Sequence, residues 1–174
     1  MSLSVSLYWA SVPQLTKMLK NLDAWLVKGV EFAKEKKFEP SILLDARLYP
    51  DQYALVRQVQ AACDSAKFAA ARLTNQDPPK HPDTEKTMEE LHARIASVVT
   101  YLGKFTAKDF EGADKRTVPL SFMEGQGLLG GDYLNEMALP NFYFHLTHAY
   151  AILRHSGVPL GKPDFIGSLA IKPL

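Results

Sequence analysis

Three of the five histidines of this 174-residue chain lie in one segment with helical spacing. His145, His148 and His155 follow one another at intervals of three and seven residues. On a helical wheel of about 100° per residue, His145 lies almost at the centre of the apolar face, and Asn141 lies one turn before it. Bundle proteins build metal and cofactor sites on such inward faces. The spacing predicts a small-molecule or metal site in the core, formed by Asn141, His145 and His148.

The chemistry of this set leaves three alternatives open. His145 and His148 could share a divalent metal such as zinc or nickel, but a catalytic zinc needs three protein ligands and an open position. The facing helices offer only Cys63 as a strong further ligand and Gln52 as a weaker one. Without a metal, His145 could act as a general base beside a pocket. It could also be a core histidine whose hydrogen bonds are made within the protein.

The remaining histidines are expected to play structural or surface roles. His155 lies in the last turn of its segment, where the helix dipole favours a cationic imidazole. His81 lies in a proline-rich loop and is expected at the surface. His92 flanks an apolar stripe and should be half exposed.

Composition indicates one ordinary globular domain covering residues 1–174. Apolar residues make up 47% and charged residues 22%, and the net charge is +1 with scattered basic residues, which argues against nucleic-acid binding. No run of 18 apolar residues predicts a membrane span, and the first residues lack the basic start of a signal peptide. The single cysteine, Cys63, excludes an internal disulfide and fits a reducing cytoplasm. On an alanine-rich helix face, Cys63 is expected to be an inert small hydrophobe.

Four segments have the periodicity of amphipathic helices and must position these residues. The segments are approximately residues 15–33, 51–73, 84–105 and 132–156. The apolar stripes of the first three are Leu15, Met18, Leu22, Trp25, Leu26, Gly29 and Ala33; Leu55, Val59, Ala62, Cys63, Ala66, Ala70 and Leu73; and Met88, Leu91, Ile95, Val98, Leu102 and Phe105. Residues expected to face water include Gln60, Asp64 and Lys67 in the second segment, Arg94 and Ser97 in the third, and Glu136, Tyr143, Thr147 and Arg154 in the fourth. The apolar side of the fourth should contain Leu134, Ala138, Asn141, His145, His148 and Ile152.

Prolines and glycines divide these segments. Pro13 should kink the first helix or mark its start, Pro140 should bend the fourth, and Gly157 should end it. The section before the fourth helix is less regular, with strand-like character at residues 116–122 and a glycine-rich stretch at 124–132 that is expected to be a loop. Residues 158–174 should form an extended tail. The chain is therefore predicted to be an all-α four-helix bundle.

The segments "LDARLYPDQYALVRQVQAACDSAK" and "ALPNFYFHLTHAYAILRHSGVPLGKPDF" resemble a branch of uncharacterised bacterial proteins grouped as a domain of unknown function. With the bundle outline and the ending "H…AILRHSGV", they place this branch near the DinB/YfiT-like superfamily of metalloenzymes. The resemblance covers nearly the whole chain. It implies a DinB-like bundle, and in some members a thiol-dependent transferase or hydrolase activity.

The resemblance also implies a ligand set, which this chain has only in part. Members of the superfamily bind a divalent metal through one histidine on the second helix and an H-x-x-x-H pair on the fourth. His145 matches the second histidine of the pair, Asn141 stands in the place of the first, and the second helix contains no histidine. An amide oxygen is a poor ligand for zinc or nickel compared with imidazole. The resemblance thus predicts a degenerate metal site, in which His148 could replace one lost ligand.

Two classes of function follow from this sequence. The first is a small-molecule enzyme or its remnant, with a pocket centred on His145 and lined by Asn141 and His148. The second is a non-catalytic bundle, a ligand-binding module or a homodimeric scaffold, in which the same residues form a buried polar network. A concave pocket bordering the fourth helix would favour the first class.

Overall fold

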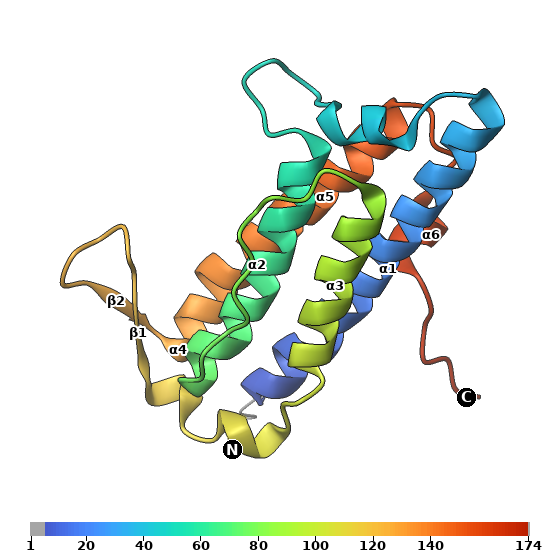
Figure 1. The fold of residues 1–174 in the computed structure, drawn as a ribbon. Helices are drawn as coiled ribbons and strands as arrows, with labels where there is room; N and C mark the ends of the chain where they lie inside the picture. Colours follow the sequence, from blue (N-terminus) through green and yellow to red (C-terminus); the bar gives the residue numbers. More distant parts are fainter. Residues whose placement is uncertain (1–5, 174) are drawn as a thin grey trace.

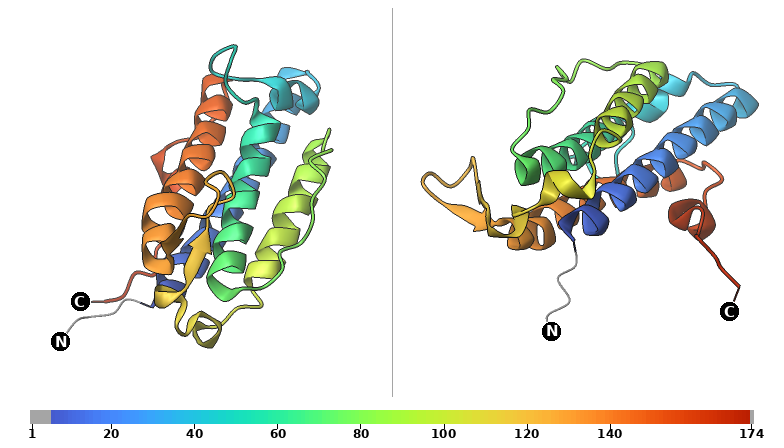
Figure 2. Two further views of the ribbon diagram at one scale, coloured as in Figure 1. Left: turned by 90° about the vertical axis from the view of Figure 1, so that its left-hand side faces the viewer. Right: turned by 90° about the horizontal axis from the view of Figure 1, so that it is seen from below.

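Four long helices run alongside one another in a computed structural model that describes residues 6–173 (Figures 1 and 2). The long helices are α1 (Leu7–Lys36), α2 (Leu55–Thr74), α3 (Met88–Leu102) and α5 (Leu139–His155). Shorter helical elements are η1 (Pro40–Asp45), η2 (Ala107–Phe110), η3 (Ala113–Lys115), α4 (Gly130–Asp132), the π-helical η4 (Tyr133–Ala138) and α6 (Lys162–Ile166). The prediction of an all-α four-helix bundle is confirmed. None of the described helices is both long enough and apolar enough to span a bilayer.

The core of the bundle is built from the apolar stripes that the sequence predicts. Every stripe residue predicted for the first three helices is buried. Side chains three and four residues apart share one side of a helix, so each stripe faces the bundle axis. Pro13 lies within α1, six residues after its first residue, and so does not mark the helix start.

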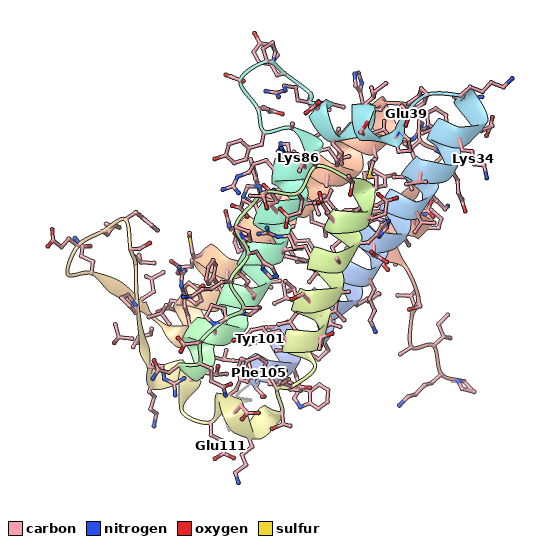
Figure 3. The ribbon with its side chains drawn as sticks, viewed as in Figure 1. Lys34, Glu39, Lys86, Tyr101, Phe105 and Glu111 are labelled. Atoms are coloured by element: carbon pink, nitrogen blue, oxygen red, sulfur yellow. The ribbon has the colours of Figure 1, made fainter. Side chains whose placement is uncertain are left out.

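Aromatic rings pack at one end of the bundle, and a small hairpin projects sideways near this end (Figure 1). The rings of Tyr101 and Phe105 meet edge to face at 5.0 Å, at the same end as Glu111, whereas Lys34 and Glu39 lie at the opposite end (Figure 3). The adjacent strands β1 (Thr117–Pro119) and β2 (Gly127–Leu129) pair antiparallel. The strand-like character of residues 116–122 is thus confirmed.

The prediction that the glycine-rich stretch is a loop is wrong for part of it, because the stretch contains β2 and α4. A Cβ atom on Gly130 would overlap the backbone oxygen of Ala113. Glycine at this position therefore lets the chain pass from the hairpin into the fourth helix against η3.

The fourth helix departs from the prediction through its π-helical segment η4. In a π-helix the hydrogen bonds span five residues instead of four, so extra chain is accommodated in the turn. The segment ends two residues before Pro140, a residue without an N–H to donate to the preceding turn. Beyond η4 the buried residues are Phe142, Leu146, Ala149, Ile152 and Leu153. The buried face is therefore shifted by about one residue, and the predicted place of His145 at its centre is wrong.

Three polar residues that were expected to face water are also buried. Gln60, Lys67 and Arg94 are 4%, 3% and 2% exposed. The connection of residues 75–87 runs back along α2 and α3 (Figures 1 and 2), and its side chains contact all three residues. Glu85 of this connection contacts Gln60 and Arg94, and His81 contacts Lys67.

The chain after α5 packs back on α1 through a short helix that the sequence does not predict. Trp25 donates a hydrogen bond from Nε1 to the carbonyl of Asp164 (3.0 Å), and its ring stacks on Phe165 with the centroids 5.4 Å apart. Beyond α6 the chain is extended, and Leu169 and Ile171 are exposed. The predicted extended tail is therefore interrupted by α6.

Candidate functional site

His145 lies at the contact between α5 and α2, where it is held by an amide. Its Nδ1 donates a hydrogen bond to Oε1 of Gln58 (2.8 Å), which is itself buried. The ring is nearly parallel to that of Tyr53, with the centroids 6.3 Å apart. Burial lowers the pKa of His145 from its ordinary value, and the positive charges of His148 and Arg57 lower it further. His145 is therefore a neutral imidazole at pH 7, with Nε2 as its acceptor.

Asn141 lies one turn earlier and makes a second polar contact with α2. Its Nδ2 donates to Oγ of Ser65 (2.7 Å), which in turn donates to the carbonyl of Ala61 (2.7 Å). His148 has a different environment, because its Nδ1 donates to the carbonyl of Phe144 in its own helix (2.7 Å). The structure thus brings Asn141 and His145 against α2 but leaves His148 on the outer side of α5.

The donors around these residues do not fit the three-histidine metal site that the resemblance implies. Opposite Asn141 and His145, α2 presents the amide of Gln58 and the hydroxyl of Ser65 rather than an imidazole. Within residues 6–173, no three or more histidine, cysteine or acidic side chains are grouped so that they could hold a metal ion. Burial raises the pKa of Cys63 to about 12, so its thiol stays protonated and is a poor ligand.

The lowered pKa of His145 leads to a pH prediction. The unfolded chain binds a proton at the ordinary pKa of 6.5, whereas the folded protein resists it. Stability should therefore be full above pH 6.5 and should decline as the pH falls towards the folded-state pKa, by at most about 1.4 kcal/mol per pH unit for this proton. Urea denaturation between pH 7 and pH 5 measures the slope, and His145→Gln should reduce it. An unchanged slope, or an NMR titration of His145 at or above 6.5, would contradict this assignment.

A cleft of about 230 Å³ lies beside Asn141, between α2, η4 and the turn of the hairpin. Its polar and charged lining comes from Arg57, Asp64, Ser65, Arg72, Ser121 and Asn141, and its apolar lining from Ala61, Phe68, Phe122, Tyr133, Met137 and Ala138. His145 and His148 are not among its lining residues. Of the three predicted binding residues, Asn141 lines this cleft and the two histidines do not.

The α2 wall of this cleft is one face of the helix. Arg57, Ala61, Ser65, Phe68 and Arg72 follow one another at intervals of three and four residues. Sequence reasoning missed this stripe because its polar members resemble an ordinary wet face. The signal that could have found it is a phenylalanine and two arginines on the side opposite the apolar stripe.

Beneath the cleft, Arg94 is the centre of a buried charge network. Its Nη2 is 2.6 Å from Asp64, and its Nη1 is 2.7 Å from Asp83 and 2.9 Å from Glu85. Lys67 also pairs with Asp64, at 2.7 Å. Burial is the largest single effect and would raise the pKa values of Asp83 and Glu85. The hydrogen bonds and charge of Arg94 outweigh it together with hydrogen bonds from Arg57 to Asp83 and from Gln60 to Glu85, so both pKa values are lowered. The carboxylates of Asp83 and Glu85 are therefore ionised at pH 7, and their ion pairs with Arg94 hold the covering connection to α3.

Two further histidines have partners in the structure. His81 accepts a hydrogen bond from Lys67 (3.1 Å) and donates one to Ser97 (3.2 Å), so it is not the free surface residue that was expected. His92 donates to Asp23 (2.6 Å) and is partly exposed, as predicted. His155 is exposed in the last turn of α5, also as predicted.

Comparison with known proteins identifies the family. Residues 7–166 match the family model described as a domain of unknown function, DUF1993. A crystal structure of a DinB family member protein from Shewanella denitrificans, at 1.83 Å resolution, is 48% identical to this chain. The similarity covers 97% of this chain and 96% of that one, with a TM-score of 0.94. No curated protein matches the chain. The chain therefore belongs to the DUF1993 family, a domain of unknown function with a DinB-like bundle.

Proposed function

We propose that this protein binds a small molecule in the cleft between α2, η4 and the hairpin turn. The observation that carries the proposal is the convergence of polar groups from separate segments on one concave site: Ser65 and Arg72 from α2, Asn141 from α5 and Ser121 from the hairpin. Small-molecule sites combine apolar walls with a few such groups. The π-helical segment also supports the proposal, because π-helical turns are frequent at functional sites.

The proposed site shares Asn141 with the metal site that the resemblance implies, but not His145. The cleft lies beside Asn141, about one helical turn from His145. Arg57 links the cleft to the His145–Gln58 hydrogen bond: it lines the cleft, and its charge also lowers the pKa of His145. Ligand binding in this site does not require catalysis.

Filling the cleft should abolish ligand binding. Ala61 lines the cleft, and Ala61→Phe would place a ring in it. We expect small organic acids, amides and amines to include binders of the wild-type protein in saturation-transfer NMR, and we expect their affinity to fall at least about tenfold in the variant. Ala24→Phe, on the exposed side of α1, is the matched control and should bind as the wild type does. Binding that is absent in the wild type, or equal in both variants, would overturn the proposal.

A metal-dependent transferase or hydrolase stays a prediction, with its own measurement. The measurement is the metal content of the untagged protein after incubation with zinc or nickel. Stoichiometric metal in the wild type that is absent from His145→Ala would support this prediction. A non-catalytic homodimeric scaffold likewise stays a prediction, and light scattering of the wild-type protein would measure its mass.

A further inference from the structure

We infer that the ligand of this cleft is a small organic monoanion, whose carboxylate binds to Arg72 and Tyr133. The inference rests on the proposed function, because it names the chemical class that the same cleft would accept. It is based on the charges around the cleft, the fixed position of Arg72, and the size and apolar character of the remaining walls.

The charges around the cleft leave one cation uncompensated. Asp83 pairs with Arg57 at 2.5 Å, and Asp64 pairs with Arg94 and Lys67. None of the ion pairs formed within residues 6–173 includes Arg72. Its guanidinium is therefore the cation of this site that is available to a ligand.

The position of Arg72 is fixed before any ligand binds. Its guanidinium lies 5.1 Å from the ring centroid of Phe68 and 5.8 Å from that of Tyr133, and Nη1 donates a hydrogen bond to the Tyr133 hydroxyl (3.2 Å). Cation–π contacts on two rings restrict the side chain. A cation held in this way loses little conformational entropy when an anion binds.

Tyr133 provides a second donor next to Arg72. Its oxygen accepts the hydrogen bond from Arg72, so its own O–H can donate to a ligand. Burial raises the pKa of Tyr133, although the nearby Arg72 opposes this, so the hydroxyl stays protonated at neutral pH. A carboxylate has two oxygens and can accept from the guanidinium and the phenol together.

The size and charge of the cleft favour a carboxylate over a larger or doubly charged anion. A volume of about 230 Å³ is smaller than the roughly 300–1,000 Å³ of usual ligand pockets. Phe68, Phe122 and Met137 line the remainder, which suits a short aryl or alkyl group. A phosphate dianion would need a second free cation, but Arg57 is neutralised by Asp83.

The anion is placed in this cleft rather than in the neighbouring one. Arg72 and Phe68 also border a second cleft, together with Arg116 and Asp77. There Arg116 donates to the carbonyl of Leu73, and the carboxylate of Asp77 would repel an anion. Only the first cleft also contains Tyr133.

The test compares acids with uncharged molecules of the same shape. Benzoate, phenylacetate and hexanoate are titrated by saturation-transfer NMR against wild-type protein, each beside its primary amide. We expect at least one acid to bind about ten- to a hundredfold more tightly than its amide, because hydrogen bonds to charged groups are the stronger ones. Arg72→Gln should remove this preference, and Tyr133→Phe should reduce it. Arg154→Gln, an exposed arginine of α5, is the control and should retain it.

The outcomes separate this inference from the proposed function. Acids and amides that bind equally well, and lose affinity together in Ala61→Phe, would overturn the anion assignment and leave the cleft as a binding site. An acid preference that persists in Arg72→Gln would also overturn it. If no acid or amide binds, and no other compound loses affinity in Ala61→Phe, both the proposed function and the anion assignment fail. Arg72→Lys tests folding and geometry together: it should fold and keep part of the preference.

Discussion

Replacing Arg94 by methionine should lower the free energy of unfolding by about 3 kcal/mol at pH 7. Removing one partner of a buried ion pair typically costs roughly 3–5 kcal/mol, because the remaining charges stay partly desolvated without compensation. The Arg94 side chain is only 1% exposed, but Asp64 and Asp83 retain 25% and 33% exposure, so the lower end of the range applies. Urea denaturation followed by circular dichroism measures the loss.

The pH dependence of this loss identifies its cause. The ordinary pKa values of Asp83 and Glu85 are 3.8 and 4.5, and both are lowered in the folded protein. The stability that they contribute is therefore present above these ordinary values and is lost as the pH falls through the folded-state values. The difference between wild type and Arg94→Met should accordingly shrink as the pH falls below about 4.5. A deficit that does not change with pH would assign the effect to packing instead of charge.

An exposed arginine provides the matched control. Arg154→Met on α5 should change the stability by less than about 0.5 kcal/mol, as surface substitutions usually do. Equal losses of stability in Arg94→Met and Arg154→Met would contradict the conclusion that Arg94 is the centre of a stabilising charge network. Because Asp64 lines the cleft and would lose its main partner, Arg94→Met should also weaken the binding of acids there.

The apolar stripes of α1, α2 and α3 could be predicted because each is a local property of its segment. A stripe such as Met88, Leu91, Ile95 and Val98 needs only helical periodicity to be assigned, and all four are buried. The burial of Arg94 could not be predicted in this way. Its partners Asp64 and Asp83 lie 30 and 11 residues away in the sequence, on α2 and on an irregular connection.

The candidate site could be predicted from the sequence only in part, because its contacts also join residues that are distant in the sequence. Asn141 lines the cleft, and its role in binding stays a prediction. His145 was placed at the centre of the buried face because a wheel assumes an unbroken α-helix, and η4 changes the phase just before it. Arg72 and Tyr133 were not assigned, because their contact joins residues 61 positions apart. Periodicity predicts which side of a helix is buried, but not where two polar faces meet.

Replacing Trp25 by alanine should destabilise the fold by about 3–5 kcal/mol, as truncation of a buried tryptophan typically does. The indole is 1% exposed and meets the ring of Tyr150 on α5 at 5.4 Å, as well as stacking on Phe165 of α6. The substitution therefore removes contacts that join α1 to two other helices, and it leaves a cavity. Thermal and urea unfolding followed by circular dichroism measure the loss.

The second tryptophan of α1 makes this prediction specific. Trp9 is 66% exposed, so Trp9→Ala should change the stability by no more than about 0.5 kcal/mol. Trp25→Phe keeps an aromatic ring but cannot donate to the carbonyl of Asp164, and its cost should fall between the two. Trp25, together with Asn21 and Lys28, attaches α6 to α1. Its loss should loosen α6, so limited proteolysis near α6 should be faster in Trp25→Ala than in Trp9→Ala. Similar stability losses for the two tryptophans would show that α6 and α5 are not held together through Trp25.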